Sequence, residues 1–112
     1  MTKMIDVIAL RGFRRTAKKL FSEADVAALI EFLGNHPDKG DVIPGTGGLR
    51  KLRWALAGRG KRGGSRVIYY YHRSEWQVLL LTVYAKNQKE DLAEREKKLL
   101  AALLKEILKP EE

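Results

Sequence analysis

The sequence has no cysteine among its 112 residues and only two histidines, His36 and His72. The first absence excludes disulfide bridges and every zinc or iron–sulfur site built on thiolate ligands. Two histidines are too few for a multi-histidine metal centre, so we expect neither a metal nor another cofactor. A chain without cysteine also fits a reducing compartment.

Long apolar runs are missing as well, so we expect no membrane-spanning segment. The first ten residues, MTKMIDVIAL, contain a short apolar stretch but no cleavage site, and we expect no signal peptide. We therefore expect a cytoplasmic protein. A length of 112 residues is ordinary for one domain, and residues 1–112 are predicted to form a single domain around one core.

Acidic residues are absent between Asp41 and Glu75, which is the most informative gap in the sequence. The whole chain has 22 Lys and Arg against 14 Asp and Glu, a net charge of +8. The excess falls within the acid-free interval, whose cations are Arg50, Lys51, Arg53, Arg59, Lys61, Arg62, Arg66 and Arg73. A confined excess of positive charge is typical of one face that binds a polyanion.

Hydrophobic periodicity predicts an α+β fold. Residues 4–10 are predicted to form a first strand, and residues 11–34 two helices or one bent helix. A loop rich in glycine and proline follows at 35–48. The remaining predicted elements are strands at 49–56, 65–72 and 76–84 and a helix at 88–108. We expect an antiparallel sheet with the N-terminal helices packed on it and a C-terminal helix.

Side chains of the strand at 49–56 are expected to alternate between two faces. Leu52 and Trp54 share one face with Arg50, and Lys51 and Arg53 share the other. Such a polar face is often only the solvated side of a half-buried strand. Beside so much other positive charge, we favour contact with phosphate, which the planar fork of arginine binds well.

Residues 58–63 match the spacing GxGxxG. The dinucleotide-binding motif requires a helix after these glycines, whereas a strand is predicted here, so we reject that interpretation. We interpret the segment as a hairpin loop whose cations Arg59, Lys61 and Arg62, together with Arg66, bind phosphates.

Tyrosine and lysine are the other candidates for chemistry. Tyr84 lies near a strand end, two residues before Lys86, where its hydroxyl could reach a substrate. His72 has no second histidine near it in sequence, which argues against a ribonuclease with paired histidines. The sequence also lacks a Ser/His/Asp set, a carboxylate pair and a nucleophile elbow.

Three ordered blocks of the sequence resemble a HigB-type toxin of the RelE/ParE superfamily, the toxic half of type II toxin–antitoxin modules. They are GDVIPGTGGLRKLRW (residues 40–54), GRGKRGGSRVIYYY (58–71) and LLLTVYAKNQKEDL (79–92). The resemblance implies a RelE-like fold and a ribosome-dependent endoribonuclease that cuts mRNA in the ribosomal A site. In that reaction the 2′-OH attacks the adjacent phosphate and leaves a 2′,3′-cyclic phosphate. The reaction needs a base, charge stabilisation and a proton for the 5′-oxygen.

The resemblance also implies site residues, by position. Lys51 and Arg53 match a basic strand pair, Arg66 opens the next strand, and Lys86 follows the last strand. Arg66 and Lys86 would stabilise transition-state charge, with Lys51 or Arg53 sharing the roles of base and phosphate ligand. The predicted RNA or ribosome contacts are Arg50, Arg59, Lys61 and Arg62. The implied partners are the ribosome, mRNA and a helix-turn-helix (HigA-like) antitoxin that binds a monomeric toxin.

The sequence departs from some RelE relatives where they carry a catalytic tyrosine, because this chain has Asp91-Leu92 there. Tyr84 could replace that tyrosine, or a lysine could be the base, and both possibilities stay open at this point. A non-catalytic gyrase poison of the ParE branch, or a simple RNA-binding module, is the alternative function. The clustered basic residues favour the ribonuclease branch.

Overall fold

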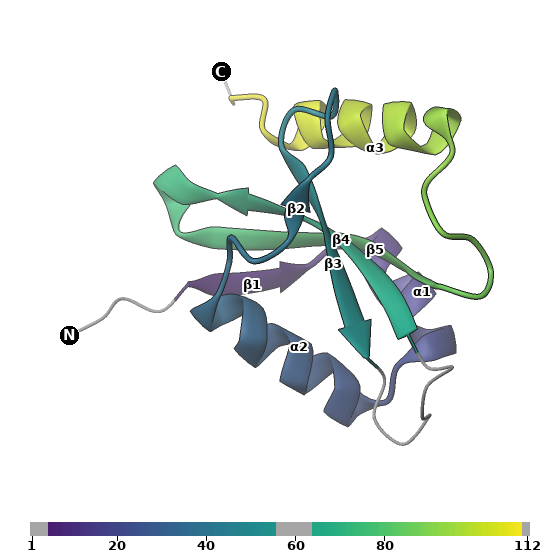
Figure 1. Cartoon of the computed structure of the whole chain (residues 1–112). Coiled ribbons are helices and arrows are strands. Elements are labelled where there is room, and N and C mark those ends of the chain that lie inside the picture. The colour runs from purple at the N-terminus through teal and green to yellow at the C-terminus, as the bar shows by residue number, and fades with distance from the viewer. Residues whose placement is uncertain (1–4, 56–63, 111–112) are drawn as a thin grey trace.

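The computed structural model describes residues 5–55 and 64–110, which form a sheet with helices on both faces (Figure 1). The elements are β1 (Asp6–Ala9), α1 (Arg11–Leu20), α2 (Glu23–Asn35), β2 (Asp41–Val42), β3 (Leu49–Ala55), β4 (Gly64–His72), β5 (Gln77–Ala85) and α3 (Glu94–Ile107). A single turn of 3-10 helix at Arg73–Glu75 joins β4 to β5.

The five strands lie in the order β1-β5-β4-β3-β2. All neighbours from β2 to β5 are antiparallel, as predicted, and the α+β class is confirmed. The edge strand β1 instead runs parallel to β5. Parallel pairing is possible because a long connection, including both N-terminal helices, separates β1 from the rest of the sheet.

The helices divide the core into two layers. Helices α1 and α2 cover one face of the sheet, and α3 covers the other (Figure 1). The first layer includes Phe13, Leu29 and Val67, and the second includes Ile68 and Leu104. Burial on both sides explains why β5 and residues 67–71 of β4 are almost continuously apolar instead of alternating with polar residues.

A β-bulge lies opposite the step from Ile68 to Tyr69. Ile68 pairs with Thr82 while Tyr69 pairs with Leu80, so Leu81 is the extra residue on β5. An extra residue resets the alternation of a strand. The consequence is that Tyr84 packs in the α3 layer, whereas Val83 packs in the layer of α1 and α2.

The boundary between α1 and α2 resolves the alternative of one bent helix in favour of two helices. The Ser22 hydroxyl accepts from the Asp25 backbone N–H at 3.1 Å, and the Asp25 carboxylate accepts from the Ser22 N–H at 2.9 Å. This reciprocal capping box starts α2 afresh. The short strand β2 was not predicted, because two residues inside a loop carry no periodicity.

The prediction of a helix at 88–108 is wrong at its start, because α3 begins at Glu94. The Glu96 carboxylate accepts from the Ala93 backbone N–H at 2.9 Å and fixes that start. Residues 86–93 form a loop whose Leu92 is buried in the α3 layer. The wide apolar face expected for this helix is only partly buried: Leu99, Leu103 and Ile107 are exposed.

Of the three consecutive tyrosines, Tyr69 is fully buried under residues 37–40. Its hydroxyl donates to the Pro37 carbonyl and accepts from the Gly40 N–H, both at 2.8 Å. A Cβ on Gly40 would lie 2.7 Å from the Tyr69 ring, so this close approach requires glycine. No helix within residues 5–55 and 64–110 is long and apolar enough to cross a membrane.

Candidate functional site

Three predicted site residues form a row across three neighbouring strands. Arg53 of β3 pairs with Arg66 of β4, and Arg66 pairs with Tyr84 of β5. Directly paired residues share one face of a sheet, and Tyr84 fixes that face as the α3 side. We call Arg53, Arg66 and Tyr84 the basic row. The antiparallel pairing of β3 with β4 agrees with the hairpin expected around residues 58–63.

Lys51 lies in the next row on the same face, paired with Ile68. Its ammonium donates to the carboxylate of Asp91, in the loop before α3. This hydrogen bond, followed by the Coulomb attraction of Lys51, lowers the pKa of Asp91 below its usual value. Asp91 was noticed in the sequence only as a departure from the relatives. Its contact with Lys51 spans 40 positions, and no local pattern reveals it.

Tyr84 is only 5% exposed, which differs from the accessible hydroxyl expected from the sequence. The hydroxyl donates to the Glu90 carbonyl at 3.4 Å, and the Lys89 ammonium lies 5.1 Å from the ring centroid. Burial chiefly raises the pKa of Tyr84, Asp91 raises it further, and Arg66 opposes both. The phenol is therefore protonated at neutral pH, and it can donate a hydrogen bond but cannot act as a base.

Lys86 lies beside the beginning of β4. Its backbone N–H donates to the Gly64 carbonyl at 3.0 Å. A Cβ on Gly64 would lie 3.8 Å from the Lys86 side chain, so that side chain lies over the glycine. Gly64 is two residues from Arg66. The exposed Lys86 therefore extends the basic row at the end nearest Gly64, which we call its open end.

The structure does not bring Arg50 to this surface. Its guanidinium lies on the α2 side of the sheet and donates to the carbonyls of Asp38 and Gly40, at 3.1 and 2.7 Å. Those bonds hold the loop that also covers Tyr69. The other predicted RNA contacts, Arg59, Lys61 and Arg62, lie outside the described residues.

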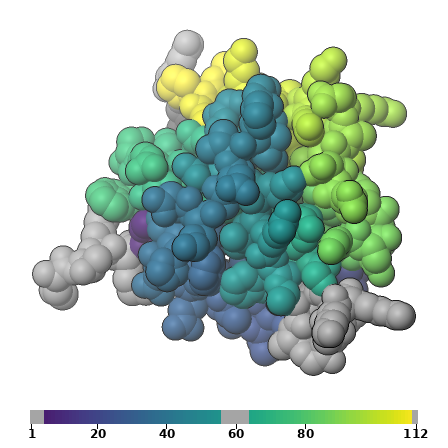
Figure 2. All heavy atoms as spheres, viewed as in Figure 1, coloured from purple at the N-terminus to yellow at the C-terminus, as the bar shows by residue number. Residues whose placement is uncertain are grey.

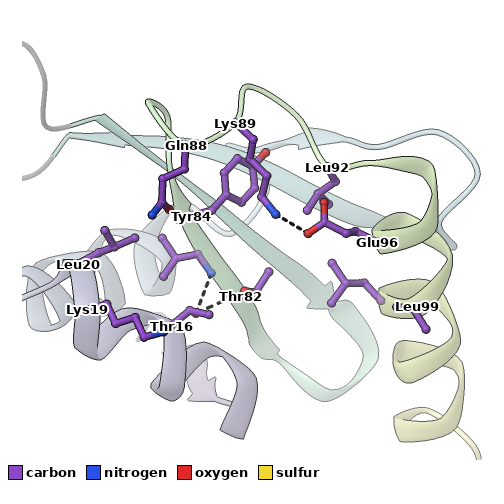
Figure 3. Close-up of a pocket in the computed structure, with 12 residues that line it drawn as sticks. Thr16, Lys19, Leu20, Thr82, Tyr84, Gln88, Lys89, Leu92, Glu96 and Leu99 are labelled. Atoms are coloured by element: carbon purple, nitrogen blue, oxygen red, sulfur yellow. Dashed lines mark hydrogen bonds and ion pairs between the residues drawn. The ribbon is translucent and has the colours of Figure 1, made fainter.

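Two hollows flank the loop at 86–93. One, of 410 Å³, lies between α1, β5 and the start of α3, and its lining includes Thr16, Lys19 and Tyr84 (Figure 3). Lys89 and Glu96 form an ion pair at its rim. The other, of 230 Å³, lies beside Lys51 and Asp91.

The space-filling view shows the segment around β2 lying against α3 and the residues before it (Figure 2). Pro44, in the segment after β2, lines the second hollow, and Lys97 lines it from α3. Within the described part of the chain, no group of three or more His, Cys, Asp or Glu side chains could hold a metal.

The clustered cations on one face of the sheet are consistent with a protein that binds a polyanion. The model of the RelE toxin of the RelE/RelB toxin–antitoxin system matches residues 6–112. This chain belongs to the RelE toxin family. The resemblance found in the sequence is therefore confirmed at the level of the family, and the HigB subtype stays a prediction.

Two solved RelE structures share the fold. A mutant of E. coli toxin RelE in the free state has a TM-score of 0.56 and 12% identity, covering 91% of this chain and 98% of that one. A chain of the toxin–antitoxin complex RelBE2 from Mycobacterium tuberculosis has a TM-score of 0.52 and 22% identity, covering 74% of this chain and 99% of that one. At these identities the matches support the fold, and the site must be argued from this chain's own residues.

Proposed function

We propose that this RelE-family toxin is a ribosome-dependent endoribonuclease. It cleaves translated mRNA in the ribosomal A site and leaves a 2′,3′-cyclic phosphate. The observation that carries the proposal is the basic row of Arg53, Arg66 and Tyr84, with Lys51 on the same face. The row supplies cations and a protonated phenol where a phosphodiester needs charge stabilisation and a proton donor.

The pairing of Arg53 with Arg66 supports a phosphate between them. Like charges directly opposite one another destabilise a sheet, and neither guanidinium forms an ion pair within residues 5–55 and 64–110. A phosphate oxygen on each guanidinium would relieve that repulsion. As negative charge accumulates on the phosphorane, the two arginines bind it more strongly than the ground state, which lowers the barrier.

The protonation states of these side chains determine which of them can donate or accept a proton in the reaction. The Tyr84 phenol stays protonated, and once RNA displaces its long bond to the Glu90 carbonyl it can donate either to the phosphorane or to the leaving 5′-oxygen. Arginine stays protonated in proteins, so Arg53 and Arg66 bind charge and do not abstract a proton. Lys51 is then the candidate base for the 2′-OH, and Lys86 is a further phosphate ligand at the open end of the row.

In the absence of RNA, the Asp91 carboxylate forms an ion pair with the Lys51 ammonium. This carboxylate stands where a phosphate oxygen would bind, since both are anionic oxygens that accept from an ammonium. An incoming RNA must therefore displace Asp91 before Lys51 can act. The loop at 86–93 thus competes with the substrate for part of the site.

We also propose a cognate antitoxin as partner, of the helix-turn-helix (HigA-like) kind, that binds one toxin monomer in the cytoplasm. A protein partner is supported by the exposed stripe of Leu99, Leu103 and Ile107, with exposed fractions of 61%, 46% and 40%. Apolar side chains at this helical spacing on a protein surface are typical of a protein contact.

The function is tested by brief induction of the chain in bacteria, followed by primer extension on translated messages. We expect growth arrest, cuts within codons only in translated regions, and rescue by co-expression of the antitoxin. Intact messages accompanied by a DNA-damage response would support the ParE-like alternative of gyrase poisoning. A double variant of Arg53 and Arg66 to Ala is the inactive control.

A further inference from the structure

Helix α1 exposes a surface made only of cations. Its buried side chains are Phe13 and Ala17, which face the core. Every fully exposed residue of the helix is basic; these residues are Arg11, Arg14, Arg15, Lys18 and Lys19. They lie outside the acid-free interval, and none of them is among the site residues predicted from the sequence. We call these five residues the α1 basic face.

Repulsion within the α1 basic face opposes the stability of the helix, although Lys18 and Lys19 lie in the last turn, where the helix dipole favours cations. Members of this face stand three and four positions apart, the spacing at which like charges repel on a helix. The first turn holds Arg11 and no acidic residue, and Leu10 provides no side-chain cap. A cation at the positive end of the helix dipole is unfavourable.

Helix α3 shows how this chain balances charge elsewhere. Glu94 and Glu96 occupy its first turn, Lys97 pairs with Glu94, and Lys89 pairs with Glu96. In contrast, the α1 basic face makes no ion pair or side-chain hydrogen bond within residues 5–55 and 64–110. Charge repulsion that no ion pair offsets is expected at a functional surface.

Although α1 covers the opposite face of the sheet from the basic row, its packing on β5 brings Lys19, at one end of the α1 basic face, to a hollow that Tyr84 also lines. Thr16 accepts a hydrogen bond from the Val83 backbone N–H at 3.2 Å, one residue before Tyr84. A Cβ on Gly12 would lie 3.0 Å from the Leu81 carbonyl, so α1 lies close against β5. Figure 3 shows Lys19 and Tyr84 lining the same 410 Å³ hollow, with Lys89 across from α1.

We propose that the α1 basic face binds the sugar-phosphate backbone of RNA, as a second contact surface continuous with the basic row through this hollow. The proposal rests on the proposed function only in taking RNA as the ligand. Five cations along ten residues present successive donors for phosphates, and arginine binds two phosphate oxygens at once.

An acidic protein is the weaker candidate for this face. Protein interfaces have apolar or aromatic anchors at their centre, and none of the exposed large apolar side chains in the described ranges lies on α1. The exposed apolar stripe is on α3 instead. A surface of charge without anchors matches phosphate binding, where affinity comes from released counterions.

The test compares two triple variants that lose the same charge. One is Arg14→Gln, Arg15→Gln and Lys18→Gln on the α1 basic face. The control is Lys98→Gln, Lys105→Gln and Lys109→Gln, three exposed lysines at the other end of the chain that form no ion pair among the described residues. Glutamine is a good helix former, and removal of repulsion should raise the melting temperature of the α1 variant, which shows that it is folded.

Binding to ribosomes and to a short single-stranded RNA oligonucleotide is measured at several salt concentrations. We expect the α1 variant to bind both more weakly, with a log–log salt slope reduced by about one unit per lost phosphate contact. The control should keep the wild-type slope. Equal slopes for the α1 variant and wild type would overturn the proposal, and so would weaker binding of the antitoxin with unchanged RNA binding.

The same measurements separate this proposal from the proposed function. If wild-type protein binds RNA through α1 but leaves translated messages intact, the nuclease function fails and the α1 surface stands. If wild type cleaves normally while the α1 variant binds and cleaves like it, the α1 surface fails and the nuclease function stands.

Discussion

Each face of the sheet carries an arginine paired with a tyrosine, and the two pairs are held very differently. On the α2 side, Arg50 pairs with Tyr69, and together they make four hydrogen bonds to the loop at residues 37–40. On the α3 side, Arg66 pairs with Tyr84. Among the described residues, Arg66 there donates only to its neighbouring Ser65 carbonyl, at 3.3 Å, and Tyr84 makes one long bond of 3.4 Å.

This comparison shows why residue type alone does not identify a site. Both tyrosines have a pKa raised chiefly by burial, and both lie near an arginine. The Tyr69 hydroxyl both donates and accepts a hydrogen bond, and the Arg50 guanidinium binds two carbonyls. Both side chains therefore have a structural role. Among the described residues, Arg53 and Arg66 retain donors without a partner, and Tyr84 uses its one donor in a single long bond to the Glu90 carbonyl. Donors left available in this way are what a binding site requires.

The largest expected effect is on the α3 side, at Lys51. As the candidate base, its replacement by Ala or by Arg should slow cleavage by roughly 10²- to 10³-fold, because neither residue can accept a proton from the 2′-OH. The measurement is single-turnover cleavage at saturating ribosomes. Rescue by Arg would show instead that Lys51 contributes only charge.

On the other side, Tyr69→Phe should destabilise the protein without changing the maximal cleavage rate. It leaves the Gly40 N–H and the Pro37 carbonyl without their buried partner. We expect a loss of about 2–3 kcal/mol in the free energy of unfolding, measured by urea denaturation. Tyr70→Phe is the matched control, since Tyr70 is half-buried and its hydroxyl has no hydrogen bond in the described structure.

Arg50→Ala should act in the same way but less strongly. It removes two bonds to carbonyls that can rehydrate in part, and we expect a loss of about 1–2 kcal/mol in the free energy of unfolding. RNA binding measured at a temperature where the variant is folded should match wild type. Weaker RNA binding with a reduced salt slope would contradict this and restore the predicted role of Arg50 as an RNA contact.

The smallest effect is expected at Asp91. Asp91→Asn removes the carboxylate that competes with phosphate for Lys51, and RNA should bind roughly two- to fivefold more tightly, as expected for an exposed ion pair. Filter binding at low salt measures this change. A large loss of cleavage in Asp91→Asn would instead mean that the carboxylate takes part in the reaction.

The Asp91 pair also predicts a pH dependence with a definite sign. The folded-state pKa of Asp91 is lowered, so its contribution to stability is present above the ordinary carboxyl pKa and is lost as pH falls through the lowered value. The urea midpoint of wild type should therefore drop more on acidification than that of Asp91→Asn. Parallel curves would show that the pair contributes nothing to folding.

Much of this arrangement follows from local sequence patterns. Alternation along β3 placed Arg50 and Lys51 on opposite faces, and the short turn after β4 placed Arg66 near Lys86. The contact between Lys51 and Asp91 was not predictable, because it depends on where residues 86–93 leave the sheet. Likewise, the bulge at Leu81 that turns Tyr84 toward α3 has no signature in its own strand. The α1 cations could not be identified as a site from the sequence, because an ordinary solvated helix face has the same pattern of residues.

The central claim is that the basic row performs transition-state stabilisation, and Arg66 tests it most directly. Single-turnover cleavage of a programmed ribosome is measured for wild type and Arg66→Ala, with ribosome binding measured in parallel. The account predicts a rate loss of roughly 10²- to 10³-fold, near-normal binding, and a 2′,3′-cyclic phosphate product from wild type. Cleavage by Arg66→Ala at the wild-type rate, or a loss of rate only in proportion to binding, would contradict it.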